Sequence, residues 1–175
     1  MIKYMNLIGI KARKASEYKV TTEVKNKVLN DYAKLIKNEK KFIINQNSKD
    51  INYARKKGLK ENLIKRLHLN ENKLDGIINS ILKIAKLRDP IDSTLEKWKR
   101  PNGLNIKRVS IPIGVIGVIY ESRPNVTSDV ASLCFKSGNV VILKGGSEAI
   151  NSNKALAKLF RKALKKNKVD ENFIQ

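Results

Sequence analysis

Two short, almost wholly apolar runs constrain the fold of this chain most strongly: GVIGVIY at Gly114 to Tyr120 and VVIL at Val140 to Leu143. The segment between them, SDVASLCFKSG, has the composition of a short helix, and another helix is predicted from about Asn151 to Lys166. Strand, helix, strand and helix at this spacing predict a parallel βαβα unit over residues 111–168. Because both runs are apolar throughout, we expect each strand to be buried on both faces. The chain is therefore expected to be an α/β protein.

Residues 1–90 are predicted to be helical. Apolar residues recur at helical spacing while Lys and Asn fill the other positions, so residues 22–45 are expected to form one amphipathic helix. Ser48 is then expected to cap a short helix that ends at Gly58, since glycine tolerates the left-handed backbone of a helix end. Two further helices are predicted, from Glu61 to Leu67 and from Asn70 to the Asp89-Pro90 pair.

The periodicity changes after these helices. Asn102-Gly103 lies between two extended runs, and both residues tolerate the positive φ of a type I′ turn. A β-hairpin is therefore predicted over residues 98–110. A two-stranded ribbon is not stable in isolation, so we expect it to pack on the body of the protein or on another subunit.

Composition excludes several classes of protein. Apolar residues make up 41% of the 175 residues and charged residues 30%, which is typical of a soluble globular protein. No run approaches the roughly 18 apolar residues of a membrane span, and the N-terminus lacks the apolar core of a signal peptide, so a cytoplasmic location is expected. The single cysteine excludes an internal disulfide, and with a single histidine beside it no metal site is expected.

The formal net charge of +21 raises another hypothesis, a basic nucleic-acid-binding module, because such a charge attracts polyanions. The positive charge is mostly lysine, and aromatic residues are only 6% of the chain. Between Val109 and Asn153 three basic residues oppose three acidic ones, so the basic excess lies outside the predicted strand-helix-strand segment. Nucleic-acid surfaces more often combine arginine with aromatic residues. We therefore interpret the lysines as solvated helix faces and expect no specific nucleic-acid partner.

Polar residues follow both predicted strands. Because parallel strands end at the same edge of a sheet, the loops after Tyr120 and Leu143 are expected to open on one side. Lysine and serine suit phosphate or ribose oxygens, and adjacent glycines allow a ligand to approach the backbone. The pattern matches neither GxGxxG nor GxxxxGK[ST], so a Gly-Gly turn beside a solvated lysine stays an open alternative. The candidate residues are Glu121, Ser122, Arg123 and Asn125 in the first loop and Lys144, Gly145, Gly146 and Ser147 in the second.

The stretch IPIGVIGVIYESRPNVTSDVASLCFKSGNVVILKGGSEA resembles the N-terminal half of the γ-glutamyl phosphate reductases, members of the aldehyde dehydrogenase superfamily. YESRPNVT followed by LKGGSEA is the most specific part, and the likeness extends from IGIKARKAS to the final helix. The resemblance implies an aldehyde-dehydrogenase-like fold in which residues 1–175 form an incomplete NADP-binding domain, with the catalytic domain absent. It also implies NADPH-dependent reduction of L-glutamate 5-phosphate to L-glutamate 5-semialdehyde and phosphate, in proline biosynthesis, by an enzyme that is a homo-oligomer when full length.

The resemblance assigns roles to the loop after the first strand. It implies that the side-chain amide of Asn125 stabilises the oxyanion that forms at the reacting carbonyl. A neutral amide suits this role, because it stabilises developing negative charge without titrating. The resemblance also places Glu121, Ser122 and Arg123 at the substrate.

The same resemblance assigns the loop after the second strand to the cofactor NADP, through Lys144, Gly145, Gly146 and Ser147. Lys144 is implied to contact the adenosine ribose. Ser147 stands where many NAD-dependent relatives have a glutamate, and the missing negative charge fits the 2′-phosphate of NADP. Glu148 follows directly, which weakens this point.

The nucleophile of the superfamily is a cysteine in the catalytic half, and the chain ends before the position where it is expected. Cys134 lies between two apolar residues on a predicted helix, with no histidine nearby to lower its pKa, so we expect it to be a buried packing residue. The chain is accordingly interpreted as the truncated front part of a reductase, inactive alone. Two alternatives stay open: a fragment of another acyl-reducing aldehyde dehydrogenase, and the basic nucleic-acid-binding module.

Overall fold

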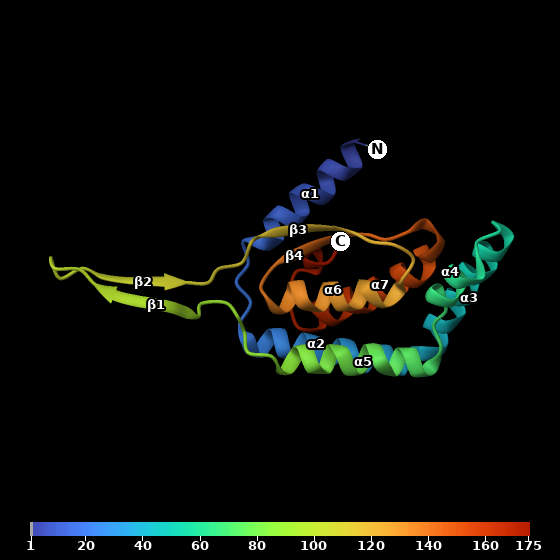
Figure 1. Ribbon diagram of the computed structural model, residues 1–175, viewed down its shortest axis with the longest axis horizontal. Coiled ribbons are helices and arrows are strands. Elements are labelled where there is room, and N and C mark those ends of the chain that lie inside the picture. Colours follow the sequence, from blue (N-terminus) through green and yellow to red (C-terminus); the bar gives the residue numbers. More distant parts are fainter. Residues whose placement is uncertain (1) are drawn as a thin grey trace.

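Helices make up the first half of the chain, and two pairs of strands follow (Figure 1). The computed structural model describes residues 2–175. The N-terminal helices are α1 (Ile2–Ser16), α2 (Thr22–Asn38), α3 (Lys40–Lys56), α4 (Glu61–Leu67) and α5 (Glu71–Lys86). After them come β1 (Thr94–Lys99), β2 (Asn105–Val109), β3 (Val115–Ile119), α6 (Pro124–Lys136), β4 (Val140–Lys144), η1 (Ser147–Ala149), α7 (Ile150–Lys166) and η2 (Glu171–Phe173). None of these described helices is long and apolar enough to span a membrane.

Local signals determine several helix ends. The side chain of Asn70 accepts a hydrogen bond from the backbone N–H of Lys73 (2.9 Å), which caps the start of α5. Gly58 has a φ of +69° just after α3, the left-handed conformation expected of a glycine at a helix end. The short helix predicted from Glu61 to Leu67 is confirmed as α4.

The prediction of one helix over residues 22–45 is wrong, because α2 ends before Glu39 and α3 starts directly after it. The break lets both helices pack against α7, and Ile36 of α2 and Ile43 of α3 are both fully buried. Ser48 does not cap a helix either. It lies inside α3 and donates a hydrogen bond to the carbonyl of Ile44 (3.0 Å).

β1 and β2 form the predicted antiparallel hairpin, which begins earlier than expected, at Thr94. Gly103 has a φ of +87°, but Asn102 is not among the described residues with positive φ, so the type I′ prediction is wrong. The N–H of Gly103 donates to the carbonyl of Arg100 (2.9 Å), and Pro101 suits the first central position of a type I turn. The ribbon projects away from the body (Figure 1), and the side chains of β1 are exposed.

β3 and β4 form the predicted parallel pair, with Val115 opposite Val140, and α6 connects them. A third strand position lies beside β4 near the end of the chain. Ile174 pairs with Val141 in parallel orientation there.

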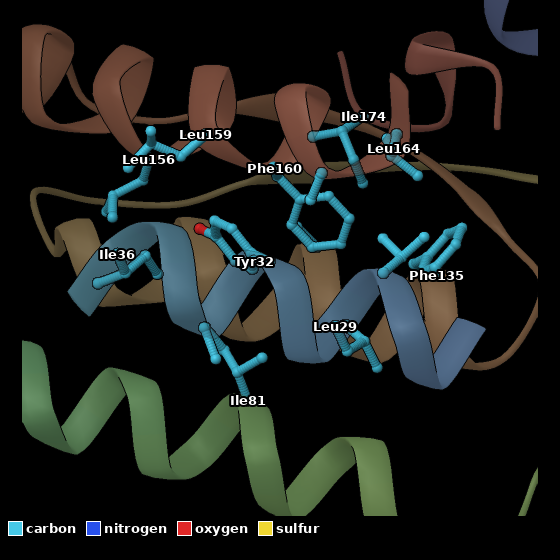
Figure 2. Close-up of a cluster of buried hydrophobic side chains, with 14 of the residues drawn as sticks. Leu29, Tyr32, Ile36, Ile81, Phe135, Leu156, Leu159, Phe160, Leu164 and Ile174 are labelled. Carbon is cyan, nitrogen blue, oxygen red and sulfur yellow. The ribbon is translucent and has the colours of Figure 1, made fainter. Parts of the chain in front are cut away.

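The main core lies between α2, α6 and α7 (Figure 2). The ring centroids of Tyr32 and Phe160 are 4.4 Å apart, and Phe135 packs edge-on against Phe160 at 5.8 Å. The hydroxyl of the fully buried Tyr32 forms a hydrogen bond with Ser128 Oγ of α6 (2.7 Å), so its polar group is satisfied inside the core. This packing holds α6, and with it the loop that precedes α6, against the helical layer.

The two strands are not buried on both faces, contrary to the prediction. Val140 and Val141 of β4 are fully buried, but the side chain of Ile119 at the end of β3 is 87% exposed. None of the described elements covers this part of the sheet. The apolar sequence of a strand therefore predicts that the strand belongs to a sheet, but not which of its two faces is covered by other elements of this chain.

Candidate active site

The loop after β3 turns sharply before α6 begins. The backbone N–H of Arg123 donates to the carbonyl of Glu121 (2.8 Å), and Pro124 occupies the first position of α6, where no N–H is needed. The side chains of Glu121 and Arg123 are exposed. Ser122 between them is buried, and its hydroxyl donates to a carboxylate oxygen of Glu148.

The two glycines after β4 make room for side chains of the protein itself. A Cβ atom on Gly145 would meet the Nδ2 atom of Asn153 and would lie 3.0 Å from Cζ of Tyr120. A Cβ atom on Gly146 would lie 2.6 Å from Oε1 of Glu148. Neither glycine has a positive φ, so close packing against Tyr120 and Asn153, and not backbone conformation, favours glycine at Gly145. At Gly146 the contact is with the end of the flexible Glu148 side chain.

Glu148 links the two loops of the site. Its carboxylate accepts hydrogen bonds from the hydroxyl of Ser122 in the first loop and from that of Ser147 in the second (3.2 Å). The exposed ammonium of Lys144 donates to the carbonyl of Gly145 (3.1 Å). Polar groups from both loops thus lie together at one edge of the sheet, and Glu148 is the residue whose linking role the sequence did not reveal.

A second connection runs from the end of β3 into α6 and α7. The hydroxyl of Tyr120 lies 2.6 Å from that of Thr127, which donates to Oδ1 of Asn153 (3.0 Å). Burial raises the pKa of Tyr120, and the hydrogen bond with Thr127 offsets this only in part. The phenol therefore stays protonated at neutral pH and keeps its hydrogen bond.

The loop after β4, residues 145–147, is called the glycine loop, and it borders a groove of about 1450 Å³. The floor of the groove is the open face of β3 and β4, and α1 and α7 form its sides. Lys144 and Ser147 lie at its edge. Basic residues of α7 line one side: Lys154, Lys158, Arg161, Lys162 and Lys165.

Asn125 lies in a different cavity, of about 400 Å³, between α6 and the helices α4 and α5. Its amide donates to Oδ2 of Asp129 (3.2 Å), and Ser80 of α5 donates to Oδ1 of the same carboxylate (3.0 Å). Arg66 and Lys73 also line this cavity. The structure therefore separates Asn125 from the glycine loop and surrounds it with residues that the sequence analysis did not select.

Cys134 is buried in the core on α6, as the sequence analysis predicted. Burial raises the pKa of its thiol. The thiol is therefore protonated at neutral pH and shielded from solvent, which does not suit a nucleophile.

Comparison with known proteins identifies the relatives of the chain, although no family model matches it. The Gamma-glutamyl phosphate reductase of Aliarcobacter butzleri is 52% identical over 147 residues, which are 84% of this chain and 36% of that protein. That of Clostridium tetani is 43% identical over 175 residues, 99% of this chain and 41% of that protein. The chain is homologous to the N-terminal part of gamma-glutamyl phosphate reductases. It spans about 40% of the length of these curated relatives.

Solved structures agree with this relationship. The crystal structure of the gamma-glutamyl phosphate reductase of Thermotoga maritima superposes with a TM-score of 0.93 at 40% identity, over 96% of this chain and 41% of that protein. A propionaldehyde dehydrogenase of Rhodopseudomonas palustris superposes with a TM-score of 0.66 at 14% identity, over 97% of this chain and 36% of that protein, which shows the fold alone. The expected aldehyde-dehydrogenase-like fold, present here as a partial domain, is confirmed.

Proposed function

We propose that residues 1–175 are the N-terminal, NADP-binding part of an NADPH-dependent γ-glutamyl phosphate reductase. Such an enzyme reduces L-glutamate 5-phosphate to L-glutamate 5-semialdehyde and releases phosphate, a step of proline biosynthesis. The observation that carries the proposal is the 43% identity to the Clostridium tetani reductase over 175 residues, because a match of this extent takes in both loops of the candidate site.

The glycine loop fits the adenosine end of NADP. The ammonium of Lys144 is exposed and spends one donor on the backbone, which leaves two N–H groups for ribose or phosphate oxygens. Ser147 places a neutral hydroxyl, and no carboxylate of its own, beside the proposed position of the 2′-phosphate. This hydroxyl and that of Ser122 both donate to Glu148, so the Ser147 proton would turn from Glu148 to the phosphate when NADP binds. The two glycines keep the loop closely packed on the strand ends. When bound, NADPH supplies the hydride for the reduction.

The loop after β3 is proposed to hold the substrate through Glu121, Ser122 and Arg123. The exposed guanidinium of Arg123 presents a fork of donors that suits the oxygens of an acyl phosphate. Ser122 already donates to a carboxylate and would keep the loop in shape. The amide of Asn125 uses one N–H group on Asp129, so its second N–H group is free to stabilise the oxyanion.

Two further parts of the proposed enzyme involve surfaces and residues outside the site. The nucleophilic thiol is proposed to lie in a part of the protein outside these 175 residues, because Cys134 is buried.

The projecting hairpin is proposed to pack on another subunit of a homo-oligomer, since it exposes Leu95 and Trp98, which are 58% and 40% accessible.

A chimera of residues 1–175 with the C-terminal remainder of the Clostridium tetani reductase tests these roles. Lys144→Ala and Ser147→Ala should raise the KM for NADPH and leave kcat comparatively unchanged, because both residues contact the adenosine end. Asn125→Ala should lower kcat and kcat/KM together, by about 100-fold or more, because the amide acts mainly in the transition state. Lys49→Ala, at an exposed position of α3, is the matched control. If Asn125→Ala changed only the KM for NADPH, the oxyanion role would be wrong.

A further inference from the structure

The smaller cavity beside Asn125 contains a carboxylate with unused hydrogen-bonding capacity. Asp129 accepts one hydrogen bond on each oxygen, from Ser80 and from Asn125, so each oxygen keeps a free lone pair. The ion pairs formed within residues 2–175 do not include Asp129, although its side chain is half-buried. A partly desolvated carboxylate without a cationic partner is a favourable site for an ammonium group.

Cations line the same cavity. The ammonium of Lys73 donates to the carbonyls of Lys65 (3.0 Å) and His68 (2.6 Å), which holds it at the C-terminal end of α4. Arg66, which also lines the cavity, takes part in none of the ion pairs within residues 2–175. Its guanidinium is therefore available to a carboxylate, for which the planar fork of N–H groups is well suited.

The polar groups of Asn125 and Asp129 lie side by side on α6, where a glutamyl group can lie alongside both. Nδ2 of Asn125 is 3.2 Å from Oδ2 of Asp129, and Oδ1 of Asp129 accepts a hydrogen bond from Ser80. Four bonds, spanning about 5 Å when extended, separate the γ-carbonyl carbon of a glutamyl group from its α-nitrogen. A glutamyl group whose γ-carbonyl lies at Asn125 can thus place its ammonium at Asp129. A cavity of about 400 Å³ has room for a molecule of this size.

From these observations we propose that the cavity binds the α-amino acid end of the substrate, with Asp129 holding the α-ammonium and Arg66 the α-carboxylate. This inference rests on the proposed function, because it takes the γ-carbonyl at Asn125 as the reacting group. It makes Asp129 and Arg66 specificity-determining residues. A compound that lacks either charge leaves one of them without its partner and binds more weakly.

Ligand binding to the 175-residue chain itself tests the proposal. Binding is monitored by nuclear magnetic resonance, through the signals of the Asn125 side-chain amide. L-Glutamate is compared with glutarate, which lacks the α-ammonium, and with 4-aminobutyrate, which lacks the α-carboxylate. We expect L-glutamate to bind with a Kd on the order of 1–10 mM and each analogue to bind about tenfold more weakly, because each loses one charge-assisted hydrogen bond.

Variants assign each charge to its residue. Asp129→Asn keeps the shape of the side chain and should weaken L-glutamate about tenfold while leaving glutarate unchanged. Arg66→Gln should weaken L-glutamate by a similar factor while leaving 4-aminobutyrate unchanged. Asp75→Asn is the matched control. Asp75 of α5 pairs with Lys40 of α3 (2.7 Å) and does not line the cavity, so its replacement should leave all three affinities unaltered.

Equal affinity for L-glutamate and glutarate would overturn the proposal, and so would the absence of L-glutamate binding to a folded chain. A folded Asp129→Asn or Arg66→Gln chain that weakened all three ligands alike would overturn it too. The chimera's activity with NADPH tests the proposed function separately. An active chimera with a chain that does not discriminate would refute the inference alone, whereas a discriminating chain with an inactive chimera would refute the function.

Discussion

Replacing Gly145 by alanine should destabilise the chain through packing alone. The new methyl group would meet Nδ2 of Asn153 and lie 3.0 Å from the Tyr120 ring. Neither side chain can move away freely, because both are hydrogen-bonded to Thr127. Gly117 in the middle of β3 is the matched control, since a Cβ atom there would meet nothing within 4 Å.

The comparison of the two variants isolates the steric cost. Both replacements restrict the unfolded chain alike, which by itself stabilises the folded state by about 0.4–1 kcal/mol. Gly117→Ala should show this gain. Gly145→Ala adds an overpacked methyl group, which costs about 1–3 kcal/mol. The free energies of unfolding of the two variants should therefore differ by about 1–3 kcal/mol, with Gly145→Ala the less stable.

Urea denaturation followed by circular dichroism measures this difference. At equal m values, the Gly145→Ala chain should unfold at a lower urea concentration than both the unmodified chain and Gly117→Ala. If Gly145→Ala were as stable as Gly117→Ala, the glycine would not be required by Tyr120 and Asn153. The glycine would then be better explained by close approach of a ligand.

Three further predictions concern pH, the thiol and nucleic acid. Burial opposes ionisation of Asp89 and of Asp31, but the groups around each carboxylate together outweigh it and lower both pKa values: Lys25, the N–H of Ile91 and Thr22 around Asp89, and Lys166, Asn167 and Lys34 around Asp31. The stabilisation of the folded state by these two carboxylates should thus be present above about pH 4 and be lost as the pH falls below it. The loss is measured as a fall in Tm, and an unchanged Tm at about pH 3 would contradict this prediction. The 175-residue chain should react with thiol reagents only on unfolding and should not reduce γ-glutamyl phosphate, because Cys134 is buried; rapid labelling of the folded chain would contradict its placement. Nucleic-acid affinity should be weak and fall steeply with salt, and tight binding to one sequence at physiological salt would favour the nucleic-acid hypothesis.

Elements whose ends carry local signals could be predicted from the sequence. Asn70 caps α5 through its own side chain, and Gly58 ends α3 in the left-handed conformation that favours glycine. The apolar runs predicted β3 and β4 and their parallel pairing, because their spacing and composition leave few alternatives. The Asn102-Gly103 pair predicted the hairpin but not its turn type, since Pro101 favours a type I turn.

Features that depend on tertiary packing could not be predicted in this way. Residues 37–41, Lys-Asn-Glu-Lys-Lys, contain neither glycine nor proline, so nothing local indicates that α2 ends before Glu39. The hydrogen bond from Ser122 to Glu148 joins residues from two separate loops, and only the folded chain brings them together. The cavity around Asn125 likewise combines residues of α4, α5 and α6, and no local pattern could have selected them.

The oxidation of NADPH by the chimera of residues 1–175 with the remainder of the Clostridium tetani reductase tests the central claim most directly. With L-glutamate 5-phosphate as substrate, we expect NADPH oxidation together with stoichiometric release of phosphate. The KM for NADPH should be lower than that for NADH, because Ser147 places no carboxylate of its own against the 2′-phosphate. A folded chimera that oxidised neither coenzyme with this substrate, beside an active Clostridium tetani enzyme, would contradict the claim.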